Sequence, residues 1–432
     1  MKQILCLLLL WCGSMTANAD RFTEMAGRHL EWIKTGQADS VLAHATPQVQ
    51  AQLSAAMVQA IWKQLLTQAG QLEKQEAWSL TERQGMHVCQ SVLRFERLPL
   101  QMNVVLNDEL LLAGLTFTPA PATATQPATP GRTDAAEAFT EEDFVVKHVG
   151  IELSGTLTLP KDLSKPVPAV VLVQGSGPQD RDETLGPNKP FRELAHALAA
   201  RGIAVVRYDK RTKVYGARMA EVSGGQLTYD TEVVDDAVQA LRQTAKLPQV
   251  DKQRLFVIGH SLGGTLVPRI AEKADTPLAG IIGWAALARP FRDALMEQLV
   301  YIARKQGADE ATAQSQAEAT AKQMMAALPR EYVDFQQTYD PTTTAQRLKD
   351  LPMLFLQGGH DYQVTEADLK LWEKALAKQP KARCVLLPKL DHLLRELPEI
   401  ACPADYLKEG KMDAEALRQI TDFILQNSLS TP

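Results

Sequence analysis

Residues 255–265 read Leu-Phe-Val-Ile-Gly-His-Ser-Leu-Gly-Gly-Thr, and the architecture of the larger part of the chain can be inferred from this stretch. Four apolar residues in a row are typical of a buried strand, and a helical pattern follows Gly264. A Gly-x-Ser-x-Gly turn between a strand and a helix lifts its serine out of the sheet, because the glycines leave room for a strained backbone. The stretch therefore predicts that Ser261 is a nucleophile; a purely structural glycine-rich turn is the alternative.

On both sides of this turn, short apolar runs alternate with helical patterns. Continuous apolar strands separated by helices predict an α/β fold, a mostly parallel sheet with helices on both faces. The expected strands are 144–149 and 151–159 as an opening hairpin, then 168–173, 203–208, 255–258, 278–284, 353–356 and 383–387; the expected helices are 191–200, 230–244, 265–273, 366–378 and 414–426.

The alternation is interrupted between the strands that end near Trp284 and begin near Met353. The sequence there is helical over residues 291–305, 311–327 and 330–337. We therefore expect a helical cap inserted at about residues 287–350.

A serine hydroxyl attacks only when a base takes its proton, and the base needs a carboxylate to orient it. On a sheet of this kind the order along the chain is serine, acid, histidine. Asp361 follows the strand 353–356 and His392 follows the last strand, so we expect these two to complete a triad. Three neighbours fit less well: His360 precedes the acid in the same loop, His260 lies inside the serine turn, and Asp391 is adjacent to the histidine.

The loop after the strand 168–173 reads Gln174-Gly175-Ser176-Gly177-Pro178. Such a glycine-rich turn can direct a backbone N–H at a developing oxyanion. We expect the amides of Ser176 and Leu262 to form the oxyanion hole; a simple strand-end turn is the alternative.

Residues 1–19 have the pattern of a cleaved secretion signal. Lys2 precedes an apolar run over residues 4–12, and Ala17-Asn18-Ala19 fits a cleavage site. The apolar run is too short to span a bilayer, which takes about 20 residues. We expect a periplasmic or secreted chain cut near Ala19 with no stable membrane anchor; a buried N-terminal helix is the alternative.

The rest of the chain divides into two folded parts. Residues 20–118 show two helical patterns and then three strand-like runs, which predicts a small α+β domain of unassigned role. Residues 119–138 begin with a stretch of only Pro, Ala, Thr and Gln and are expected to form a linker. Residues 139–432 would then form the α/β domain with its cap.

Of the five cysteines, Cys6 and Cys12 lie in the predicted signal, which leaves three in an oxidising compartment. Cys384 and Cys402 are the candidate disulfide, with Cys89 free. Three reduced thiols are the alternative.

Composition argues against a disordered chain and against a nucleic-acid partner. With 432 residues, 45% of them hydrophobic and 22% charged, the chain is folded rather than disordered. Its net charge of −5 supplies no excess of cations to neutralise phosphates, so we expect no nucleic-acid partner. Nothing in the sequence implies a metal or an organic cofactor, and it does not indicate an oligomeric state.

Four motifs together resemble the α/β-hydrolase superfamily: residues 174–182, Tyr208-Asp209-Lys210-Arg211, the Ser261 turn and residues 358–364. The branch that is most similar comprises capped bacterial carboxylesterases with a small N-terminal α+β module. The resemblance implies the same roles for the triad Ser261, Asp361 and His392 and for the oxyanion hole.

Two positions depart from the pattern of that branch. Such esterases commonly begin the oxyanion loop with His-Gly, where this chain has Gln174-Gly175. Thr212 stands where a glycine usually follows the Asp-x-Arg segment. Neither departure removes a member of the triad.

We therefore expect a secreted serine carboxylesterase that hydrolyses small-molecule acyl esters through an acyl-enzyme. A serine peptidase or amidase of the same fold and a catalytically vestigial binding protein are the alternatives. An acyl-CoA thioesterase fits an exported chain less well. Cap side chains that could line an acyl pocket, or else pack the cap helices together, are Phe291, Met296, Tyr301, Met324, Met325 and Tyr332.

Overall fold

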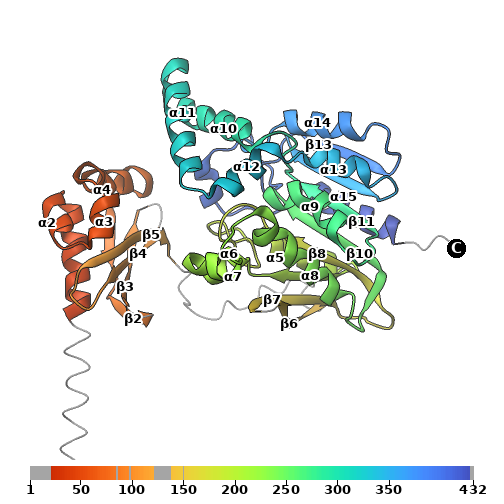
Figure 1. The fold of residues 1–432 in the computed structure, drawn as a ribbon, viewed down its shortest axis with the longest axis horizontal. Coiled ribbons are helices and arrows are strands. Elements are labelled where there is room, and N and C mark those ends of the chain that lie inside the picture. The colour runs from red at the N-terminus through yellow and green to blue at the C-terminus, as the bar shows by residue number, and fades with distance from the viewer. Residues whose placement is uncertain (1–20, 84–85, 97–98, 121–137, 149, 429–432) are drawn as a thin grey trace, which may run out of the picture. The chain divides into compact units, whose positions relative to one another are not determined.

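The computed structural model describes residues 21–83, 86–96, 99–120, 138–148 and 150–428. It forms two compact units, residues 1–131 and residues 132–432 (Figure 1). The predicted signal peptide and its cleavage site lie outside the described residues, as do positions 121–137 of the predicted linker.

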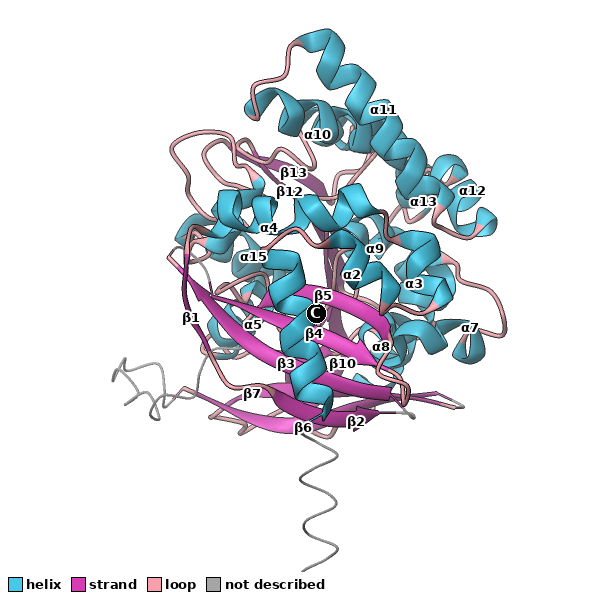
Figure 2. Cartoon of the chain, turned by 90° about the vertical axis from the view of Figure 1, so that its left-hand side faces the viewer, coloured by secondary structure: helices cyan, strands magenta, loops and turns pink. Residues whose placement is uncertain are grey.

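The first unit packs helices on an antiparallel sheet (Figure 2). The sheet order is β1-β3-β4-β5 with β2 paired to β3, and every second residue of β3 is buried because the strand turns one face to the helices. The two strands missing from the prediction, β1 and β2, are short and rich in charged residues. The elements are a helix over residues 21–34, α2 (Ala38–Ala43), α3 (Pro47–Gln52), α4 (Ala55–Ala69), β1 (Leu72–Gln75), β2 (Ser79–Arg83), β3 (Met86–Phe95), β4 (Pro99–Leu106) and β5 (Leu112–Pro119).

The second unit is built on an eight-stranded sheet of order β13-β12-β11-β10-β8-β9-β7-β6. The six strands from β13 to β9 are parallel, and at one edge β7 pairs antiparallel with β9 and β6 pairs antiparallel with β7. The strands are β6 (Phe139–His148), β7 (Ile151–Pro160), β8 (Val167–Val173), β9 (Ala204–Tyr208), β10 (Val250–His260), β11 (Gly280–Trp284), β12 (Met353–Gly358) and β13 (Ala382–Leu387).

Helices cover both faces of this sheet. Alternate residues of β8 show the division: Val170 and Leu172 join the apolar cluster of α5 and α15, whereas Val171 and Val173 join that of α8, α9 and α14. The predicted α/β-hydrolase class of fold is confirmed. The helices are α5 (Pro190–Ala199), α8 (Asp235–Thr244), α9 (Leu262–Lys273), α14 (Glu366–Leu376) and α15 (Ala414–Asn427), with the short α6 (Arg211–Tyr215) and α7 (Met219–Val222) after β9.

Between β11 and β12 the chain forms the expected cap helices. The helices α10 (Phe291–Lys305) and α11 (Glu310–Ala326) pack together as a hairpin, and α12 (Arg330–Thr338) follows (Figure 1). The rings of Tyr332 and Phe335 on α12 make T-shaped contacts with the ring of Tyr229, which lies just before the π-helical turn Asp230–Val234 that leads into α8. A further helix, α13 (Pro341–Arg347), packs on α9 and α14.

The candidate disulfide between Cys384 and Cys402 is wrong, because both are free thiols, as is Cys89. Cys384 is held inside β13 opposite Phe355 of β12 and packs against the apolar core. Burial there raises its pKa to about 12. Cys402 caps a separate 3₁₀ helix, Pro403–Leu407, where its amide donates to Asp405.

The thiols provide a direct check of this arrangement. A chain that begins at Asp20, unfolded in denaturant without reductant, should titrate three thiols with Ellman's reagent. The same titration after reduction is the control. Fewer thiols before reduction than after it would show that the protein contains a disulfide.

Candidate active site

Ser261 lies at the turn between β10 and α9 with a backbone φ of +52° and ψ of −115°. The neighbouring glycines make this turn possible: a Cβ on Gly259 would lie 2.2 Å from the carbonyl carbon of Gly263, and a Cβ on Gly263 would lie 2.2 Å from the oxygen of Val173. The Ser261 amide donates to the carbonyl of Trp284 at 2.8 Å, which ties the turn to β11. The serine is therefore held in a strained conformation at the carboxyl end of the sheet.

Asp361 and His392 meet at the same end of the sheet, after β12 and β13. The distance from His392 Nδ1 to Asp361 Oδ2 is 2.7 Å, and both side chains are buried. The second carboxylate oxygen accepts hydrogen bonds from the amides of Gln363 and Val364 at 2.7 and 3.1 Å. The carboxylate is thus fixed in one orientation against the imidazole.

Two opposing effects act on the pKa of His392. Burial lowers it, whereas the charge of Asp361 and its hydrogen bond raise it, and the pKa ends above its ordinary value. The imidazolium form is therefore stabilised, as a base that must hold a proton during turnover requires.

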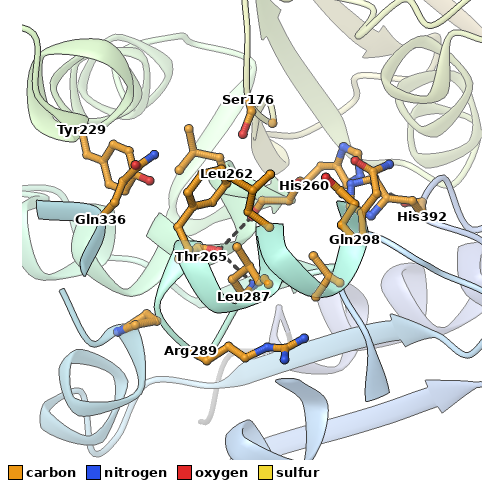
Figure 3. A pocket seen from close by; sticks show the side chains of 18 of the residues that line it. Ser176, Tyr229, His260, Leu262, Thr265, Leu287, Arg289, Gln298, Gln336 and His392 are labelled. Atoms are coloured by element: carbon orange, nitrogen blue, oxygen red, sulfur yellow. Dashed lines mark hydrogen bonds between the residues drawn. The ribbon is translucent and has the colours of Figure 1, made fainter. Parts of the chain in front are cut away.

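Ser261 and His392 line the same cavity, and Figure 3 shows the imidazole at one edge of it. Among the hydrogen bonds of the described residues, none joins the Ser261 hydroxyl to the imidazole. Because Nδ1 is engaged by Asp361, Nε2 is the nitrogen available to the serine. Such bonds are often long before substrate binds.

The competing residues have other partners. His260 Nε2 and Trp284 Nε1 lie 3.0 and 2.9 Å from the carbonyl oxygen of His392, so they hold its backbone. His360 Nδ1 lies 2.8 Å from the carbonyl of Leu397. Asp391 pairs with Arg395 at 2.6 Å.

The loop after β8 and the start of α9 contribute two backbone amides to the cavity. Leu262 is the first residue of α9, so its N–H has no acceptor within the helix. Within the described part of the chain, no hydrogen bond uses the amide of Ser176. Both residues line the cavity, and the two amides are suited to bind an oxyanion.

Two residues that hold this loop were missed by the sequence analysis. The Glu183 carboxylate accepts the Gly175 amide at 2.7 Å, and Lys210 Nζ donates to the Gly175 carbonyl at 2.8 Å. Both are buried charged side chains. The loop is therefore fixed at both the amide and the carbonyl of Gly175.

The two departures from the esterase pattern have structural explanations. The Gln174 side chain donates to the carbonyl of Tyr208 and so anchors the oxyanion loop to β9. The Thr212 hydroxyl donates to the carbonyl of Gly177 at 3.3 Å. Each side chain adds a tether to the loop.

The cavity has a volume of about 270 Å³. Of the six cap side chains considered above, Phe291 and Met324 line it, and Met296 and Met325 are not among the described lining residues. Tyr301 donates instead to the carbonyl of Ile400, and Tyr332 donates to the Glu232 carboxylate. Further lining residues are Leu185, Tyr229, Thr265, Leu287, Arg289, Ala294, Leu295, Gln298, Gln336, Tyr339, Pro341, Gln363, Val364 and Tyr406 (Figure 3).

The charge of Arg289 in this cavity is neutralised by the protein. Its guanidinium lies 3.2 Å from the buried carboxylate of Asp368 and also pairs with Glu297. It donates a further hydrogen bond to the Thr365 hydroxyl at 3.2 Å. The cavity therefore suits an uncharged group better than a ligand that brings a carboxylate of its own.

The described ranges lack two kinds of feature. They contain no group of three or more His, Cys, Asp or Glu side chains placed to hold a metal ion. They also contain no helix with the length and apolar character needed to cross a membrane.

Residues 170–406 match the model of the alpha/beta hydrolase family, and the chain belongs to this family. It is similar to a curated protein, Esterase EstD of Thermotoga maritima, with 33% identity over 426 residues, 97% of this chain and 98% of the relative. Residues 26–115 match a second family, a protein of unknown function termed DUF3887. The resemblance inferred from the motifs is confirmed.

Solved structures with a similar chain include further esterases. Est1E from Butyrivibrio proteoclasticus is 16% identical with a TM-score of 0.44, over 67% of this chain and 99% of that one. The esterase PF2001 from Pyrococcus furiosus is 14% identical with a TM-score of 0.43, over 71% of this chain and 97% of that one.

The strain at Ser261 predicts a difference in stability between two variants of this residue. Glycine accepts a positive φ without a Cβ clash, so Ser261→Gly should be about 1 kcal/mol more stable than Ser261→Ala. Urea unfolding of both variants measures the two free energies of unfolding. Equal stabilities would show that the turn is not strained.

Proposed function

We propose that this protein is a secreted serine carboxylesterase that hydrolyses small-molecule acyl esters. The observation that carries the proposal is the buried hydrogen bond from His392 to Asp361, placed on the same cavity as the strained Ser261. The full-length similarity to Esterase EstD supports the ester as substrate class. The pattern of residues 1–19 supports export to the periplasm or beyond.

In the proposed reaction Ser261 Oγ attacks the ester carbonyl carbon while its proton passes to His392 Nε2. Asp361 stabilises the imidazolium, and the amides of Ser176 and Leu262 stabilise the oxyanion. The carbon–oxygen bond to the leaving alcohol breaks as the imidazolium returns the proton to it. Water then repeats these steps on the acyl-enzyme and releases the carboxylic acid.

The dimensions and charge of the cavity favour a short, uncharged acyl group. Its volume of about 270 Å³ falls just below the 300–1,000 Å³ typical of ligand pockets. Apolar side chains such as Phe291 and Leu295 line it from the cap, and Arg289 is already paired. A long acyl chain would exceed this volume.

The first test is hydrolysis of p-nitrophenyl esters from acetyl to dodecanoyl by a chain that begins at Asp20. We expect the highest kcat/KM for short acyl groups, and a loss of at least about 10⁴-fold in Ser261→Ala. Ser176→Ala is the control and should stay active, because the proposed donor is its backbone amide. Full activity of Ser261→Ala, or equal cleavage of a peptide anilide, would contradict the esterase.

The pH dependence tests the assignment of the base. His392 accepts a proton only when neutral, and its raised pKa places the acidic limb of kcat/KM above the ordinary value of 6.5. In Asp361→Asn the principal raising effect is lost and burial remains, so the limb should move to lower pH, with kcat down by about 10⁴-fold.

The control for this comparison is Asp350→Asn, the same change at an exposed position. This variant should have the same pH profile of kcat/KM as the unmodified chain. An acidic limb that stays in place in Asp361→Asn would rule out the carboxylate as the partner of the base.

A further inference from the structure

Lys210 is a buried cation beside the oxyanion loop. Its ammonium group lies 2.8 Å from the carbonyl oxygen of Gly175 and 2.6 Å from the Glu232 carboxylate. All three residues are buried. The ammonium therefore connects a loop of the cavity to a carboxylate outside the triad.

The bond to Gly175 bears on the proposed oxyanion donor. The carbonyl of Gly175 and the amide of Ser176 belong to one planar trans peptide, in which C=O and N–H point in opposite directions. A donor that holds the carbonyl thus also sets the direction of the N–H. The charged donor further polarises this peptide, which strengthens the N–H as a hydrogen-bond donor.

Glu232 is in turn held by the cap. It lies on the π-helical turn Asp230–Val234 that precedes α8, and its second oxygen accepts the Tyr332 hydroxyl of α12 at 2.6 Å. Burial, and then the charge of Glu232, raise the pKa of Tyr332, so the hydroxyl stays protonated and donates. A continuous chain of bonds runs from α12 to the oxyanion loop.

We propose that Lys210 is a positioning residue that orients the Ser176 amide, and that α12 controls this orientation through Tyr332 and Glu232. This inference rests on the proposed function. It gives the cap a part in stabilising the transition state, beyond lining the acyl pocket.

A purely structural role for these residues predicts a different outcome. If the bonds only fasten the cap, breaking them changes stability and KM. If they orient an oxyanion donor, breaking them lowers kcat with KM nearly unchanged, because the oxyanion exists only in the transition state.

The sharpest variant is Tyr332→Phe, which keeps the ring and its contact with Tyr229 but removes the hydroxyl. We expect kcat on the best p-nitrophenyl ester to fall about tenfold, less than the 10²–10³-fold typical for removing an oxyanion donor, with KM within about twofold. The matched control is Tyr301→Phe, which removes a cap hydroxyl bound to Ile400 and should leave kcat and KM unchanged.

A second, double variant avoids the misfolding that a single unpaired buried charge could cause. Lys210→Met/Glu232→Gln removes both charges together, so no unpaired buried charge remains. We expect kcat to fall by about 10²-fold, and the affinity for an alkyl trifluoromethyl ketone, which forms a tetrahedral adduct on the serine, to fall by a similar factor. Circular dichroism and labelling by a phosphonate report whether the variant is folded.

The outcomes separate the two proposals. Unchanged kcat in Tyr332→Phe and unchanged ketone affinity in the double variant would overturn the positioning role, even if Ser261→Ala is inactive. Activity that survives Ser261→Ala would overturn the proposed function itself.

Discussion

The close approach of β10, α9 and β8 around Ser261 is the constraint on which the site is built. No Cβ can be accommodated at Gly259 or Gly263, because backbone atoms occupy the space. The helix therefore starts directly at the sheet, and the serine is left with a positive φ. This packing also brings the amide of Leu262 and the loop after β8 to the same cavity.

Much of the fold and of the candidate site could be predicted from local sequence. Continuous apolar runs identify parallel strands because both faces of the sheet are buried, and the carboxyl ends of such strands bring Asp361 and His392 together. The charged strands β1 and β2 were missed because they lack the apolar alternation that reveals a half-buried strand. The disulfide was wrong because strand register holds Cys384 against the apolar core, whereas Cys402 lies at the start of a separate 3₁₀ helix.

The residues that support the site could not be predicted in the same way. Glu183 and Lys210 carry charges, which usually indicates a solvated surface, yet both are buried against the oxyanion loop. Glu183 is eight residues from Gly175 and Lys210 is 35 residues from it, and pairings at such spacings have no periodic signal. Which of the six cap side chains line the cavity could not be predicted for a similar reason, since a helix pattern shows an apolar face but not what that face contacts.

The pairing of Lys210 with Glu232 also bears on why such groups are buried. A buried ion pair is weak evidence for stability, because desolvation of two charges offsets much of their attraction. An apolar pair could fill the space, but it could not donate to the carbonyl of Gly175. Only a hydrogen-bond donor at this position can fix the direction of the Gly175 carbonyl. The cost of burying the charge is therefore best explained by orientation of the oxyanion loop, and the Tyr332 hydroxyl makes that orientation depend on the cap.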